Sequence, residues 1–309
     1  MTRRGLQLCL GVLWLLDGAL QLQPVMFTGR FASGIIAPAA VGQPALVHWA
    51  VSTTASVIGS SPALFDAAFA TAQLLLGIGL LWRRSAPVAL LCSVGWAAGV
   101  WVTGEGAGGL LGSGATALTG APGAAALYAL LALAAWPGRD GRQSAATPAR
   151  WIVPAWVALW AGLALLELRL GAAAGPDTAA SLTANLHGLP SAIVSGSRSL
   201  AAAVRHAGAA PGVVLAAAFA LVALLAVRRG AARAGAGVLG ALLAGLLWVF
   251  AEGFGAIPSG QATDPNSGPL LALAAVAVWS IARRDRVVAR AYAGATGGAT
   301  DGELATRAA

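Results

Sequence analysis

Eight apolar segments divide the chain, and clusters of arginine occupy every second connection between them. The segments are residues 6–22, 63–82, 86–102, 122–136, 151–170, 211–227, 235–250 and 269–282. A membrane-spanning helix needs about 17–25 predominantly apolar residues. Every backbone polar group at membrane depth must also be hydrogen-bonded, which helices achieve within one segment. The pattern predicts an all-α polytopic membrane protein with eight transmembrane helices, in which the fourth and eighth extend into flanking small residues.

The positions of the basic residues predict the orientation of this bundle. All 19 basic residues are arginine, and 15 of them lie before the first segment, in the even-numbered connections or after the last segment. Basic residues concentrate on the cytoplasmic side of bacterial membrane proteins. We therefore expect a multi-pass protein of the bacterial plasma membrane with cytoplasmic N- and C-termini and the lipid bilayer as its main partner.

The composition supports this class and narrows the functions. Only 10% of the residues are charged and 58% are hydrophobic, whereas soluble domains carry about 25% charged residues. The net charge of +8 raises nucleic-acid binding as an alternative. The arginines form short clusters without a basic patch that alternates with aromatic residues, so we expect no nucleic-acid partner. The two cysteines and three histidines show no metal-ligand spacing, and we expect no metal site.

The second half of the chain repeats the first. WVTGEGAGG starts at Trp101 and WVFAEGFGA at Trp248, 147 positions later. Further pairs keep nearly the same spacing, namely Trp14 with Trp160, Arg83-Arg84 with Arg228-Arg229, Glu105 with Glu252, and Pro122 with Pro269. These residue types are rarer than alanine and leucine, so chance agreement is a poor explanation. We predict two four-helix repeats in parallel, related by a pseudo-two-fold axis along the membrane normal.

This interpretation divides the chain into four parts. Residues 1–137 are the first membrane repeat, 138–150 a cytoplasmic linker, 151–284 the second membrane repeat, and 285–309 a cytoplasmic tail. The tail is rich in small and polar residues, so we expect it to be disordered. Each repeat has a long outer segment, residues 23–62 and 171–210, in which we expect short helices at the outer interface. An ordinary ordered loop is the alternative.

The repeated glutamates are unusual for their position. In this topology Glu105 and Glu252 lie at the outer, C-terminal ends of helices, where the helix dipole disfavours a carboxylate by about 0.3–1 kcal/mol. Gly106 and Gly253 follow them and suit a left-handed helix cap. If the helix continues far enough, each glutamate shares a face with the tryptophan four residues earlier.

Two interpretations of this motif remain open. In the first, Trp101 and Trp248 are interfacial anchors, and the glutamates hold the glycine-rich loops through backbone hydrogen bonds. In the second, the two carboxylates line an outward-facing cavity, because ionisable groups near membrane depth are costly unless they serve a function.

The candidate ligand-binding residues all lie toward the outer side: Glu105, Glu252, Trp101, Trp248, Asp17 and Glu167. The inner halves of the segments contain almost no ionisable residues, which disfavours a proton or ion path across the bilayer. The chain has no nucleophile–base spacing, P-loop or dinucleotide fingerprint. We therefore identify no catalytic residue and expect the protein not to be an enzyme.

Each half resembles the DoxX-like family of small four-span membrane proteins. The resemblance lies in R-x5-L-G-x2-W-L-L-D-G-A-L-Q-L from Arg4 to Leu22 and in AQLLLGIGLLWRRSAPVALL from Ala72 to Leu91. That family typically carries a lysine shortly after the second glycine of its first span. This chain has Gln21 there, and Glu167 in the second copy. The resemblance implies a link to membrane oxidoreductase assemblies, with a quinone as cofactor or another membrane subunit as partner.

Three hypotheses of function follow. The first is a non-catalytic binding or assembly protein that holds a lipophilic small molecule or a partner in an outward-facing polar cavity. The second is a small-solute transporter that uses the interface between the repeats. The third, which rests on the resemblance alone, is a quinone-linked component of a membrane oxidoreductase complex.

Overall fold

The computed structural model describes residues 1–137 and 150–307, with side chains up to residue 287. Within these residues the fold is all-α, with no strand. Most of the predicted linker, residues 138–150, lies outside the described part. The bundle is formed by α1 (Arg3–Gln21), α3 (Pro62–Leu81), α4 (Ala86–Thr103), α5 (Ala124–Ala134), α6 (Ile152–Arg169), α9 (Ala210–Val227), α10 (Ala231–Phe250) and α11 (Ser267–Arg307).

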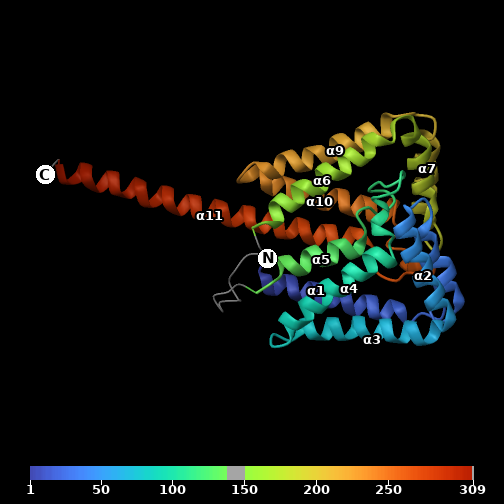
Figure 1. The fold of residues 1–309 in the computed structure, drawn as a ribbon. Coiled ribbons are helices and arrows are strands. Elements are labelled where there is room, and N and C mark those ends of the chain that lie inside the picture. Colours follow the sequence, from blue (N-terminus) through green and yellow to red (C-terminus); the bar gives the residue numbers. More distant parts are fainter. Residues whose placement is uncertain (138–149, 308–309) are drawn as a thin grey trace.

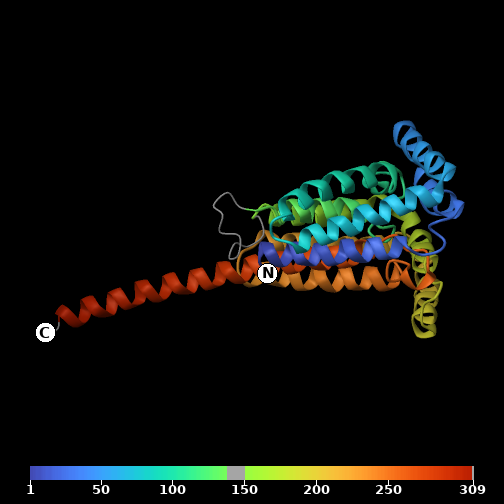
Figure 2. The same cartoon turned by 90° about the horizontal axis from the view of Figure 1, so that it is seen from below.

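Short helices cover one end of this bundle. The predicted outer segments contain η1 (Phe31–Ile36), η2 (Ala37–Ala40) and α2 (Ala45–Ser60) in the first half, and η4 (Gly171–Ala173), α7 (Ala174–Ala184) and α8 (Ser191–Val204) in the second. The prediction of short helices in both segments is confirmed. Figure 1 and Figure 2 show α2 and α7 across the end of the bundle that is opposite the N-terminus.

Five described helices are long and apolar enough to cross a membrane: α3, α4, α6, α9 and α10. The helical membrane class predicted from the sequence therefore holds in its coarse form. α3, α4 and α9 each have a proline in their first turn, where the missing N–H removes no helical hydrogen bond. α1 and α5 are not among these five helices. α1 carries charged residues, and α5 has only 11 residues.

Small residues let the helices of the first half approach closely. A Cβ on Gly18 would lie 2.7 Å from Leu74 of α3, and a Cβ on Gly11 would lie 3.1 Å from the carbonyl oxygen of Gly77. Close contact of this kind replaces the hydrophobic effect as the source of helix association in a lipid environment. The α1–α3 contact fixes the position of the face of α1 that carries Asp17.

The loop before the last helix of each half reaches the other half. Gln23, just after α1, donates through Nε2 to the carbonyl oxygen of Ala262, with a distance of 2.9 Å. Glu167 of α6 accepts a hydrogen bond of 3.2 Å from the backbone N–H of Ala117. The two halves are therefore interlocked at the covered end of the bundle.

Buried positions recur at fixed intervals along the two halves. α1 buries Leu6, Gln7, Leu10, Trp14, Asp17, Gly18 and Gln21, and α6 buries Ile152, Val153, Trp156, Trp160, Leu163, Ala164 and Glu167, each 146 positions later. α3 buries Asp66, Ala70, Gln73, Leu76, Gly77 and Leu80, and α9 buries Gly212, Ala216, Phe219, Val222, Ala223 and Ala226, again 146 positions later. Residues at these intervals can therefore be compared directly.

Two expectations about the second half are wrong. α5 starts at Ala124 and α11 at Ser267, 143 positions apart, so the structure matches Pro122 with Pro265 rather than with Pro269. The loop before α5 is longer by four residues, which a comparison of identical residues alone does not reveal. The tail expected to be disordered is instead the backbone of α11, which continues to Arg307 beyond the bundle (Figure 1), although its glycines, among them Gly297 and Gly298, have low helix propensity.

Candidate functional site

The first W-x3-E motif joins the end of α4 to the start of α5. The helix ends at Thr103, two residues before Glu105, so the expectation that Trp101 and Glu105 share a helical face is wrong. Both side chains instead reach the start of α5. Trp101 donates through Nε1 to the carbonyl oxygen of Pro122 at 2.7 Å, and Glu105 Oε1 accepts from the backbone N–H of Ala125 at 3.0 Å.

The second motif makes the same connection between α10 and α11. Trp248 donates through Nε1 to the carbonyl oxygen of Pro265 at 2.8 Å. Glu252 Oε2 accepts from the backbone N–H of Gly268 at 3.0 Å, and Oε1 accepts a short hydrogen bond from the Ser267 hydroxyl. We call each arrangement a clasp, formed by the tryptophan, the glutamate and the start of the next helix.

The clasps explain why a glutamate follows each of these helices. The free N–H groups and positive dipole end of the following helix favour a carboxylate there. The glutamates therefore hold the next helix, rather than only the glycine-rich loop. The left-handed conformation predicted for the two glycines is confirmed, with φ of 56° at Gly106 and 55° at Gly253. They lie two residues beyond the helix caps, which are the right-handed residues Gly104 and Ala251. A side chain at Gly108 would also collide with the carbonyl of Pro122.

The two glutamates differ in how completely they are hydrogen-bonded. Both carboxylate oxygens of Glu252 have partners, whereas Oε2 of Glu105 is buried without one. Burial, and to a smaller extent the nearby carboxylate of Asp264, raises the pKa of Glu105 to about 8, although the hydrogen bonds from the start of α5 oppose the shift. Burial also raises the pKa of Glu252 to about 7, although the hydrogen bonds from Ser267 and Gly268 oppose the shift.

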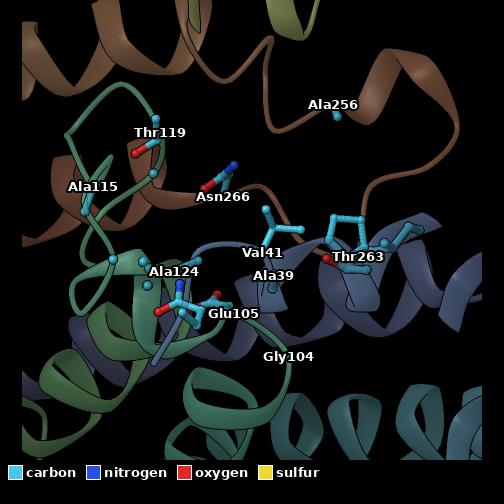
Figure 3. A pocket seen from close by; sticks show the side chains of 18 of the residues that line it. Ala39, Val41, Gly104, Glu105, Ala115, Thr119, Ala124, Ala256, Thr263 and Asn266 are labelled. Atoms are coloured by element: carbon cyan, nitrogen blue, oxygen red, sulfur yellow. The ribbon is translucent and has the colours of Figure 1, made fainter. Parts of the chain in front are cut away.

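Glu105 and Asp264 border three adjoining cavities at the covered end of the bundle. The outer cavity has a volume of about 650 Å³ and lies between the η2 region and the loops before α5 and α11. In Figure 3, Glu105 lies beside Ala124 at the start of α5, and Asn266 and Thr263 lie on the loop of the second half. A second cavity of about 350 Å³ lies beside α4, and a third of about 30 Å³ reaches inward to Asp17 and Tyr128.

Polar side chains converge on the inner part of these cavities. We call this group the chamber, and it consists of Trp14, Asp17, Gln73, Trp96, Glu105, Tyr128 and Asp264. Several of its buried polar atoms have no hydrogen-bond partner, namely Gln73 Oε1, Trp96 Nε1 and Glu105 Oε2. Asp17 and Tyr128 have no partner of regular geometry but interact with each other. Buried polar groups are nearly always hydrogen-bonded. Such a concentration of unpartnered atoms around a cavity is typical of a binding site.

Asp264 is the contribution of the second half to this chamber, and the sequence analysis missed it. Its carboxylate accepts from the Thr263 hydroxyl at 2.8 Å and from the backbone N–H of Asn266 at 2.7 Å. Burial raises its pKa, and these two hydrogen bonds oppose the shift. The position 147 residues earlier is Ala117, so no carboxylate is repeated here, and a search for repeated residues cannot find Asp264.

The corresponding region of the second half is apolar. At the intervals found for the buried positions, Asp17 corresponds to Leu163, Gln73 to Phe219, Trp96 to Leu243 and Tyr128 to Leu271. Leu163, Phe219 and Leu271 are at most 2% exposed. Leucine and phenylalanine thus occupy, in the second half, positions that carry unpartnered polar groups in the first, although the indole N–H groups of Trp156 and Trp160 are also buried without a partner there.

The structure brings together only part of the predicted site. Asp17 and Glu105 meet in the chamber. Trp101, Trp248 and Glu252 serve the clasps and line none of the three cavities. Glu167 contacts the first half through Ala117, and its other oxygen is buried without a partner. Gln73, Trp96 and Tyr128 were missed, because single polar residues inside apolar helices form no motif.

The chamber combines polar and aromatic side chains. Among the residues that the structure describes, no group of three histidine, cysteine, aspartate or glutamate side chains has the spacing to hold a metal ion. The chamber residues offer carboxyl, amide, phenol and indole groups around an aromatic wall. These groups recognise a ligand through hydrogen bonds, charge and ring contacts.

Comparisons with protein families, characterised proteins and solved structures give no match for this chain.

Proposed function

We propose that the chain is an eight-span membrane protein built from two duplicated four-span units. The recurring buried positions and the two clasps support the duplication. The packing of α1 on α3 and of α5 and α10 on α11 supports the inclusion of α1, α5 and α11 among the spans. Two units with four spans each enter the membrane in the same sense, so their axis of pseudo-symmetry lies along the membrane normal.

The distribution of arginine supports cytoplasmic termini, which places the chamber at the outer face of the membrane. Reporter enzymes fused after residues 105, 252 and 287 test this orientation. The first two fusions are expected to be active outside the cytoplasm and the third inside it. Opposite locations for the fusions after 105 and 252 would contradict both the duplication and the orientation.

The proposed function is non-catalytic binding of a lipophilic small molecule that carries a polar head group. One observation carries this proposal: the unpartnered polar atoms of the chamber face a cavity in the first half, where the second half has leucine and phenylalanine. Since the second half folds without these polar groups, the fold does not require them. The apolar and aromatic residues beside α4 suit the lipophilic part of the ligand, and the chamber suits its head group.

Transport and quinone-linked redox chemistry have less support. The chamber lies at one end of the bundle, and the carboxyl groups Asp17, Asp66 and Glu167 all lie toward that same end. A transport path requires polar groups further across the membrane. The DoxX-like resemblance, with its implied quinone or membrane-subunit partner, remains a prediction from two short stretches of sequence.

The test is the identity of the molecules that co-purify with the protein. Native mass spectrometry of the full chain from its membranes is compared with a variant that combines Asp17→Leu, Gln73→Phe and Tyr128→Leu, the residues of the second half. A control carries Leu163→Met, Phe219→Leu and Leu271→Met at the equivalent positions. We expect a bound lipophilic molecule with the wild type and the control and none with the chamber variant. Equal occupancy of the chamber variant would contradict the proposal.

A further inference from the structure

We propose that the ligand is a single-chain amphiphile with an ammonium head, and that it reaches the chamber sideways from the outer leaflet through a glycine-lined slot on α4. This inference rests on the proposed function and specifies its ligand class and route. Three features carry it: the shape of the cavity beside α4, the chemistry of its polar end, and the difference between the two halves.

The slot is the cavity of about 350 Å³ between α4, α2, η1 and α3. Gly95, Gly99 and Thr103 line it at intervals of four, so they share one face of α4. A Cβ on Gly95 or Gly99 would meet no atom within 4 Å. The opposite wall is apolar and aromatic, with Phe31, Ile58 and Phe69 among its residues. Such a narrow apolar space suits one hydrocarbon chain.

The inner end of the slot presents hydrogen-bond acceptors. Gln21 and Gln73 line it, are 4% and 7% exposed, and each has an unpartnered Oε1. The adjoining chamber adds the unpartnered oxygens of Asp17 and Glu105. The unpartnered donors there are the Trp96 indole N–H and the Tyr128 hydroxyl, which can also accept. The two glutamine amides can donate as well as accept, so the carboxyl groups decide the balance, and a group that only donates fits their ionised forms best.

The charges around the slot favour a cation. Three carboxyl groups, Asp17, Glu105 and Asp264, border the chamber, and no arginine or histidine lines the slot or the chamber. Phe69 and Trp96 stand edge to face with their centroids 5.5 Å apart, and aromatic faces attract ammonium groups. Burial favours the protonated form of Glu105, and an ammonium group would favour ionisation of the three carboxyl groups and pair with them. An alcohol offers no counter-charge, and a fatty carboxylate would be repelled by any carboxyl group that is ionised.

The second half carries leucine at the equivalent positions. Gly95 and Gly99 correspond to Leu242 and Leu246, 147 positions later, which project from α10 with exposures of 62% and 55%. The two glycines therefore distinguish the first half from the second, and the first half is also the half that carries most of the polar chamber. The slot and the chamber therefore belong to one site.

The test uses the full chain in lipid nanodiscs with dodecylamine, dodecanol and dodecanoic acid as probes. Binding is followed by native mass spectrometry and by quenching of tryptophan fluorescence. We expect the wild type to bind dodecylamine at least about tenfold more tightly than the other two probes, about the size of one good charge-assisted contact. The Gly95→Leu/Gly99→Leu variant is expected to lose at least about tenfold in affinity for dodecylamine, because leucine side chains fill the slot.

Gly245→Leu on α10 is the matched control, because a Cβ there also meets no atom within 4 Å; it is expected to bind like the wild type. Equal binding of dodecanol and dodecylamine would overturn the ammonium head, and unchanged binding by the double variant would overturn the slot. If the double variant does not fold, the single variants Gly95→Leu and Gly99→Leu make the same test. A wild type that binds none of the probes and retains no co-purified lipophile would refute the proposed function itself.

Discussion

Replacing Asp17 by leucine is expected to stabilise the protein while it removes ligand binding. Asp17 is 1% exposed, and its Oδ1 has no hydrogen-bond partner. The Tyr128 hydroxyl interacts with Asp17 through charge and a weak side-chain hydrogen bond that falls outside regular geometry. Leu163 occupies the corresponding position of α6 and is 2% exposed, so the framework accepts leucine there.

The size of the effect follows from the missing partners. A buried polar group without a hydrogen-bond partner costs about 1–3 kcal/mol. Leucine removes this cost and fills part of the adjoining cavity of about 30 Å³. The Tyr128 hydroxyl then loses a polar neighbour, which offsets part of the gain. We expect Asp17→Leu to raise the free energy of unfolding by about 1–2 kcal/mol.

Unfolding in mixed micelles, titrated with a denaturing detergent and followed by tryptophan fluorescence, measures this free energy. The reverse replacement, Leu163→Asp, provides the control. It loses apolar packing and buries a carboxyl group, so we expect destabilisation by at least about 3 kcal/mol. The reasoning is refuted if Asp17→Leu destabilises the protein by more than about 1 kcal/mol, because Asp17 would then belong to the structural framework.

Three further predictions concern the clasps and their glutamates. Trp101→Phe and Trp248→Phe each remove one hydrogen bond to a proline carbonyl, so both should lower the unfolding free energy by a similar amount of about 1 kcal/mol; a large effect from only one of them would contradict equivalent clasps. Glu252→Ala leaves the Ser267 hydroxyl and the Gly268 N–H without an acceptor, whereas Glu105→Ala affects the Ala125 N–H. The former should therefore cost more, about 2–3 kcal/mol against about 1–2 kcal/mol in the same titration. Glu105 faces the carboxyl of Asp264 and the hydroxyl of Tyr128, and its pKa of about 8 exceeds the value of about 4.3 in an unfolded chain. The stability that it contributes is complete below about pH 4 and is lost as the pH rises through 8. Glu105→Gln should therefore flatten this decline, and equal pH profiles of stability for variant and wild type would count against the raised pKa.

The sequence predicted the helical membrane class because its signals are local. Apolar length and flanking prolines act within single segments, and five helices meet the length and hydropathy that a span requires. The left-handed glycines after α4 and α10 were also predictable, since the motif places Gly106 and Gly253 just beyond helix ends. The order and burial of the helices followed from these local preferences together with the repeated spacing.

The chamber could not be predicted in the same way, because its residues are distant in the chain. Asp17, Gln73, Tyr128 and Asp264 come from three helices and a loop of the opposite half, and of these four only Asp17 was among the candidates from the sequence. The role of Glu105 and Glu252 could not be predicted from the sequence either. A carboxylate at a helix C-terminus is unfavourable on its own, and only the position of the next helix shows why it is favourable here.

Comparing the two halves distinguishes polar residues that the fold needs from polar residues that serve a function. Glu105 and Glu252 are polar in both halves and make the same connection to the next helix, so their recurrence follows from folding. Asp17 and Tyr128 are polar in one half only, although Leu163 and Leu271 are buried at the corresponding positions. Unpartnered polar groups that the framework does not need lower stability, and proteins retain such costs mainly at functional sites. The residues that differ between the halves are therefore better guides to the ligand than the conspicuous motif that they share.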